Sequence, residues 1–88
     1  MRTRRYVVTG RVQGVGYRAS ARAAALRFGL AGWVRNLPDG RVEACAVGDD
    51  TALADFEAWL RRGPRLSRVD RVESVDVPFA DYADFLIR

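Results

Sequence analysis

The sequence contains no histidine and no lysine, and Cys45 is the one cysteine among its 88 residues. The missing histidines remove the commonest general base of enzymes and the commonest protein ligand of transition metals. A lone cysteine can neither close an internal disulfide nor supply a cysteine cluster for a metal. We therefore expect a protein that uses no metal and no other cofactor.

Long apolar runs are also missing, and no stretch approaches the roughly 20 residues that a membrane-spanning helix needs. Met1–Arg5 carry no apolar run followed by a small-residue cleavage site, so the sequence predicts no signal peptide. Together with the lone cysteine, these features predict a cytoplasmic protein that does not act in a membrane. The length is enough for one modest core, which predicts a single domain spanning residues 1–88.

The charge is basic but dispersed, with 15 basic and 11 acidic residues giving a net charge of +4. A basic balance suits an anionic partner. The arginines, however, alternate with Asp and Glu along the chain, whereas nucleic-acid binding normally needs a basic cluster on one face. The sequence therefore does not favour nucleic acid as a partner. Nothing in it indicates an obligate dimer, and we expect a monomer.

The hydrophobic pattern predicts two helices and four or five strands. In chain order these are a strand at 4–12, a helix from 17 or 18 to 28, strands at 31–36 and 41–47, a helix capped by Asp49 or Asp50 and ended by Gly63, a strand at 68–77 and a short strand at 85–88. Val69 is out of phase with Val72, which indicates a bulge or a two-sided strand. This order is typical of the ferredoxin-like split β-α-β sandwich, an α+β fold with two helices on one face of an antiparallel sheet.

The loop Gln13–Gly16 lies between the first strand and the first helix. Glycines allow successive main-chain N–H groups to turn toward one point. The helix start adds further free N–H groups and the positive end of the helix dipole, which together favour an anion such as phosphate. Arg18 stands where the loop meets the helix, and its guanidinium can hold two phosphate oxygens at once.

Three interpretations of this loop are open on its residues alone. It can be a tight turn between strand and helix. Gly14–Ala19 also fits the G-x-G-x-x-A pattern of dinucleotide-binding folds, but those folds need repeated parallel units, and here a hairpin follows the first helix. The Gly-Lys-Ser/Thr sequence of nucleotide P-loops is missing. The third interpretation is a cradle for one phosphoryl group.

Three motifs in fixed order resemble the acylphosphatase family: Gly10–Arg18, Gly32–Asn36 and Asp39–Glu43. The Gly63-Pro64 helix end and the Phe85–Arg88 terminus also resemble it, so the resemblance covers essentially the whole chain. Several motifs in one order are far more specific than any one of them.

Departures from the family pattern are small. Tyr17 stands where phenylalanine is also common, and Arg41 stands where a hydroxyl residue often sits. Relatives often add a tyrosine after the position of Arg88.

The resemblance implies a hydrolase acting on acid anhydrides, which splits the carboxyl-phosphate bond of an acyl phosphate into a carboxylate and inorganic phosphate. It implies two catalytic residues: Arg18 binds the phosphate, and Asn36 positions the attacking water in line. The phosphate oxygens would be held by the main-chain amides of Gln13, Gly14, Val15, Gly16, Tyr17 and Arg18. The chemistry agrees, because a carboxylate leaves readily and needs no strong acid catalyst. The family also implies that the water gives its proton to the bound phosphate.

A second hypothesis is a ferredoxin-like module that binds RNA or a protein without catalysis. RNA binders of this fold carry aromatic side chains on the central strands of the open sheet face. The sequence offers a poor stacking surface there: Val7, Thr9, Arg11, Glu43 and Cys45.

Other prominent side chains have structural interpretations. We expect the aromatic rings of Trp33, Tyr17 and Phe56 in the core. We expect Asp39 and Glu43 at a turn and on the surface, and Cys45 in a structural role because no histidine can activate it.

Overall fold

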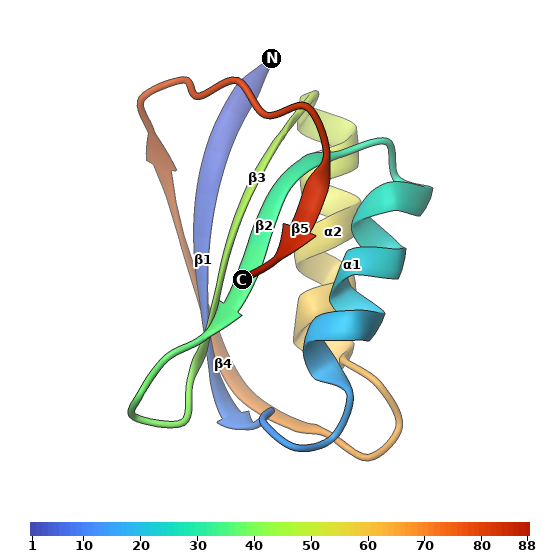
Figure 1. Cartoon of the computed structure of the whole chain (residues 1–88), viewed down its shortest axis with the longest axis vertical. Helices are drawn as coiled ribbons and strands as arrows, with labels where there is room; N and C mark the ends of the chain where they lie inside the picture. Colours follow the sequence, from blue (N-terminus) through green and yellow to red (C-terminus); the bar gives the residue numbers. More distant parts are fainter.

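A computed structural model describes residues 1–88 as a five-stranded sheet with two helices packed on one of its faces (Figure 1). The strands are β1 (Arg2–Arg11), β2 (Ala31–Asn36), β3 (Val42–Gly48), β4 (Arg68–Val77) and β5 (Phe85–Ile87), and the helices are α1 (Tyr17–Arg27) and α2 (Asp50–Arg62). The order of strands across the sheet is β4-β1-β3-β2-β5. The predicted ferredoxin-like α+β fold is confirmed.

The first four strands pair antiparallel, as expected, whereas β5 pairs parallel to β2. After β4 the chain passes over the ends of the other strands and enters the far edge of the sheet in the direction of β2 (Figure 1). This pairing aligns Val34 of β2 with Ile87 of β5. The last residues of the chain therefore lie beside the strand that carries Asn36.

The core lies between the sheet and the helices. Phe56 of α2 is fully buried and makes edge-on ring contacts with Tyr6 at 5.7 Å and Phe85 at 5.9 Å between centroids. Small side chains such as Ala21 and Ala24 face the sheet from α1 and are fully buried. Because alanine takes little space, α1 packs close to β2 and β5, which fixes the position of its first turn.

Of the two alternatives for the region of Val69, a bulge or a two-sided strand, the structure has a bulge. Thr9 of β1 pairs with Arg71, and Gly10 pairs with Val69, so Asp70 has no partner across the ladder. Gly10 has a φ of 142°, and a Cβ at this position would overlap the main-chain oxygen of Arg68. Only glycine allows β4 to approach β1 this closely just before the loop begins.

The expected positions of the aromatic residues need one correction. Tyr17 and Phe56 are buried in the core, but Trp33 lies half-buried on the open face of the sheet, paired with Cys45. Alternation along β2 directs Val34 inward and its neighbour Trp33 outward. The Trp33 indole donates a hydrogen bond to the Tyr82 hydroxyl at 3.2 Å, and two guanidiniums flank its ring.

The expectation for Glu43 also needs correction, because this residue is 3% exposed rather than a surface residue. It lies on β3, between strands whose Arg5 and Arg35 side chains both donate hydrogen bonds to its carboxylate. Burial opposes ionisation of the carboxyl. The hydrogen bonds and charges of the two guanidiniums outweigh this effect and hold the pKa of Glu43 below its usual range.

This arrangement predicts acid sensitivity. A carboxyl group whose pKa is lowered by folding stabilises the fold near neutral pH, and that contribution is lost as pH falls through the folded-state pKa. We expect Glu43→Gln to lower the free energy of unfolding near pH 7. The difference in this free energy between variant and wild type should narrow as pH falls below the usual pKa of glutamate. Urea titrations across this pH range measure the difference.

Glu73→Gln is the matched control, since Glu73 is exposed and pairs with Arg71 on the edge strand. It should follow the wild-type pH dependence. A difference for Glu43→Gln that stays constant with pH would contradict this account.

Candidate active site

The loop between β1 and α1 turns on two glycines. Gly14 and Gly16 have φ values of 75° and 77°, in the left-handed region that glycine adopts without strain, and Val15 stands between them. Gly16 is also the N-cap residue of α1. A chain that alternates in this way forms a concave main-chain surface of the kind that binds anions.

Main-chain N–H groups of residues 13–19 donate no hydrogen bond within the protein, and the first bond of α1 runs from the Ser20 N–H to the Gly16 oxygen at 3.1 Å. No side chain caps α1, and no acidic residue lies in its first turn. At the start of α2, by contrast, the Asp49 side chain accepts a hydrogen bond from the Ala52 N–H at 2.8 Å. The start of α1 therefore keeps its donors and its partial positive charge for another acceptor.

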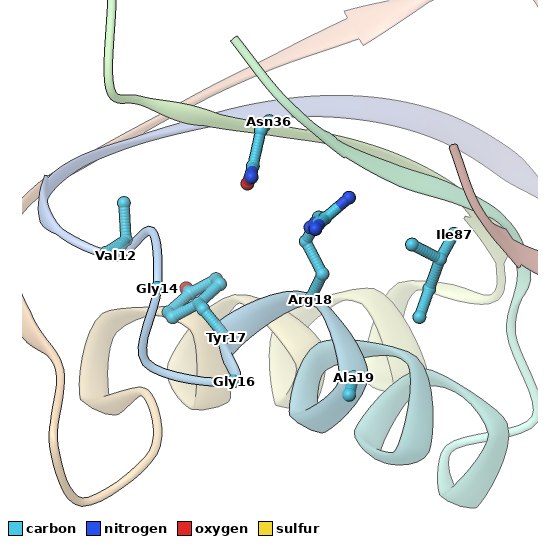
Figure 2. A pocket seen from close by; sticks show the side chains of 8 residues that line it. All are labelled: Val12, Gly14, Gly16, Tyr17, Arg18, Ala19, Asn36 and Ile87. Atoms are coloured by element: carbon cyan, nitrogen blue, oxygen red, sulfur yellow. The ribbon is translucent and has the colours of Figure 1, made fainter.

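A hollow of about 200 Å³ adjoins these groups. It is lined by Val12, Gly14, Gly16, Tyr17, Arg18, Ala19, Asn36 and Ile87. Figure 2 shows the Arg18 side chain rising from α1 and the Asn36 side chain descending from the end of β2 into the same space. The two residues that the sequence predicts as catalytic thus face one hollow from different elements.

Asn36 is the last residue of β2, and its side-chain oxygen Oδ1 is buried without a hydrogen-bond partner. A buried acceptor left without a partner costs on the order of 1–3 kcal/mol, so proteins rarely keep one without a use. This oxygen can accept a hydrogen bond from a small donor that enters the hollow, such as water.

No Asp or Glu carboxylate lies within ion-pair distance of the Arg18 guanidinium. Its one hydrogen bond in the protein runs from Nη1 to the main-chain oxygen of Arg88 at 3.3 Å. Most of its donors are therefore available to an anion beside the loop.

Two of the residues predicted to bind phosphate do not line the hollow. Val15 packs against the core, and the Gln13 side chain turns toward the hairpin that joins β2 and β3. Sequence reasoning missed three residues that do line it: Val12, Ala19 and Ile87. They are apolar and carry no chemical signature, and Ile87 reaches the site only through the parallel pairing of β5.

Tyr17 lines the hollow, yet its hydroxyl points toward α2 and takes no part in the site. The hydroxyl is buried and donates a hydrogen bond to the main-chain oxygen of Leu60 in α2 at 2.7 Å. Burial raises the pKa of Tyr17 well above its usual value, so the phenol stays protonated. The side chain ties the first turn of α1 to the second helix.

Neither helix is long and apolar enough to cross a membrane. No three His, Cys, Asp or Glu side chains lie together as ligands for a metal ion.

Fold and site together define a ferredoxin-like domain with a glycine loop of free N–H donors at the start of its first helix. A family model described as acylphosphatase matches residues 4–87. The acylphosphatase of Nitratidesulfovibrio vulgaris strain DP4 is 58% identical over 78 residues, which cover 89% of this chain and 78% of that protein. The chain belongs to the acylphosphatase family.

Solved structures agree with this assignment. The acylphosphatase of Bacillus subtilis superposes with a TM-score of 0.97 at 37% identity, covering 100% of this chain and 99% of that one. The acylphosphatase of Coxiella burnetii gives a TM-score of 0.96 at 37% identity, covering 99% of this chain and 92% of that one.

The contact between Tyr17 and Leu60 gives a testable expectation. Tyr17→Phe removes the hydroxyl and leaves a buried carbonyl without its donor, so we expect a loss of about 1–3 kcal/mol in the free energy of unfolding. Urea denaturation measures this loss, and the folded variant should keep its turnover rate. Reduced turnover at unchanged stability would show instead that the hydroxyl acts on the substrate.

Proposed function

We propose that the protein hydrolyses acyl phosphates, splitting the carboxyl-phosphate anhydride bond into a carboxylate and inorganic phosphate. The observation that carries this proposal is the convergence of three features on one hollow in a member of this family. They are the free N–H groups of the glycine loop, the Arg18 guanidinium, which has no Asp or Glu partner, and the Asn36 side-chain oxygen, which has no hydrogen-bond partner.

Phosphate binding is assigned to the start of α1. The main-chain N–H groups of Gln13 to Arg18 hold the phosphate oxygens, and the Arg18 guanidinium adds the positive charge. The open space around Gly14 and Gly16 supports this assignment, since no protein atom lies near the position of a Cβ on either glycine. Donors fixed before the substrate arrives stabilise charge on the phosphoryl oxygens without reorganising during the reaction.

Water attack is assigned to Asn36. Its Oδ1 accepts a hydrogen bond from a water and holds that water in line with the bond to be broken. The water oxygen bonds to phosphorus while the anhydride bond breaks, and the carboxylate leaves with the bonding electrons. The proton of the water passes to an oxygen of the bound phosphate, because asparagine is not a base.

Neither a strong acid nor a metal is required by this chemistry, since a carboxylate is already a good leaving group. Placing the water and stabilising the phosphoryl oxygens are the remaining tasks, and main-chain amides, one guanidinium and one carboxamide can perform both. The proposal therefore includes a metal-free reaction. It also includes the monomeric state and the cytoplasmic location expected from the sequence.

The alternative of a non-catalytic RNA module has less support. On the open face, the central strands β1 and β3 present Thr3, Arg5, Val7, Glu43, Cys45 and Val47, none of them aromatic. Trp33 is on β2, beside the sheet edge, and Arg35 and Arg88 lie against its ring at 5.4 and 4.8 Å. Salt-dependent RNA binding without turnover of acyl phosphates would reverse this preference.

The two catalytic assignments predict different losses. Asn36→Ala should lower kcat for benzoyl phosphate by at least about 10²-fold, with little change in the affinity for inorganic phosphate. Arg18→Ala should lower kcat to a similar degree and also weaken phosphate binding, because it removes the fixed charge. Steady-state kinetics with phosphate as a competitive inhibitor measures both quantities.

Circular dichroism of both variants should match the wild type, since neither side chain packs in the core. Near-normal turnover in either variant would refute that residue's assignment.

A metal-free reaction predicts that EDTA has no effect. Wild-type protein dialysed against EDTA should hydrolyse benzoyl phosphate at an unchanged rate, and added divalent cations should not accelerate it. The spontaneous hydrolysis of the substrate under each condition is the blank. A rate that falls with EDTA and returns with one cation would show that a metal takes part.

A further inference from the structure

The Gln13 side chain makes the most specific polar contact near the site that the proposed mechanism does not use. Its Nε2 donates hydrogen bonds to the main-chain oxygens of Leu37 at 2.8 Å and Arg41 at 3.0 Å. A carboxamide nitrogen has two N–H donors, so both are used. Gln13 does not line the hollow.

These two acceptors lie at the base of the hairpin between β2 and β3. The Leu37 N–H donates to the Arg41 oxygen at 2.8 Å, which closes the hairpin at this level. Leu37 directly follows Asn36, and Gln13 directly precedes Gly14. The Gln13 carboxamide thus connects the first residue of the phosphate loop to Leu37, the residue that follows the proposed water-positioning Asn36.

The sheet does not make this connection. β3 separates β1 from β2, and the pairing of β1 with β3 ends at Val8 and Val42. Beyond that point, Gly10 and Arg11 of β1 pair only with β4. The loop that follows leads into α1, and the Gln13 side chain connects it to the hairpin.

We infer that Gln13 is a positioning residue: its side chain sets the separation between the phosphate loop and Asn36, and hence places the attacking water on the phosphorus. This inference rests on the proposed function. The rate depends steeply on the alignment of the attacking water, since a displacement of about 1 Å can lower the rate on the order of 10²-fold. Phosphate binding depends on the loop and Arg18 alone and should be less sensitive.

Two substitutions test the link. Gln13→Leu removes both donors, and Gln13→Glu replaces them at neutral pH with a carboxylate that faces two carbonyl oxygens. For each variant we expect kcat for benzoyl phosphate to fall by about 10- to 100-fold. The inhibition constant for inorganic phosphate should change by less than about threefold, because the loop donors remain.

Gln13→Glu also predicts a change in the pH profile. A protonated carboxyl has one O–H donor, which can restore one of the two hydrogen bonds. Its kcat, relative to wild type at the same pH, should therefore recover as pH falls toward the ordinary glutamate pKa of about 4.3. Gln13→Leu cannot regain a donor and should show no such recovery.

Thr3→Val is the control for a purely structural effect. Thr3 is 2% exposed, and its hydroxyl accepts a hydrogen bond from the Ala80 N–H at 3.1 Å, at the opposite end of β1 from the loop. This variant should lose stability in urea denaturation and keep its kcat. If both Gln13 variants behave in the same way, Gln13 is only a structural residue and the inference is overturned.

The proposed function can fail separately. A wild-type protein without acyl phosphate turnover would refute the proposed function, and the Gln13 link would then be decided by amide hydrogen exchange. Faster exchange in Gln13→Leu at Ser20 and Leu37, whose N–H groups are hydrogen-bonded to the oxygens of Gly16 and Arg41, would support the link. Unchanged exchange at both places would overturn it.

Discussion

The structure depends on keeping a short piece of main chain in shape while its N–H groups have no acceptor in the protein. A loop of this kind cannot hold itself through internal hydrogen bonds, so its surroundings must hold it. The bulged pairing of β1 with β4 fixes where the loop begins, and the buried Tyr17 ring fixes where it ends. The Gln13 side chain restrains it from the hairpin side. Three anchors therefore replace the hydrogen bonds that an ordinary turn would make.

The distribution of charges also keeps the start of α1 free for an anion. The carboxylate of Glu43 lies between Arg5 and Arg35 on the open face, and surface carboxylates pair with most of the remaining arginines of the strands. Arg18 is left without such a partner, and α1 begins without an acidic residue. Since a guanidinium already paired with a carboxylate binds a further anion weakly, this separation keeps one cation and one helix start free in the same place.

Much of the fold was predictable because its signals are local. The Asp49 cap, the glycine loop and the phase change at Val69 are each visible within a few residues, and the motifs that resemble the family carry Arg18 and Asn36. The burial of Glu43 was not predictable, because it depends on Arg5 and Arg35 from the neighbouring strands. Alternation places Trp33 and Val34 on opposite faces of β2, but which face the helices cover depends on the tertiary packing. The place of Ile87 in the site was not predictable either, because it follows from the parallel pairing of β5 with β2. The three-residue apolar run that forms β5 does not indicate which strand it pairs with.

The bulge in β4 has a consequence beyond the loop. β4 is a ten-residue strand at one edge of the sheet, and such an edge invites another chain to add a strand. The unpaired Asp70 interrupts the regular spacing of its main-chain groups, and exposed charges line the rest, including Arg68, Arg71, Glu73 and Asp76. An incoming strand would have to desolvate these charges against an irregular template. The bulge that lets β4 approach Gly10 of β1 thus also protects the protein against edge-to-edge aggregation.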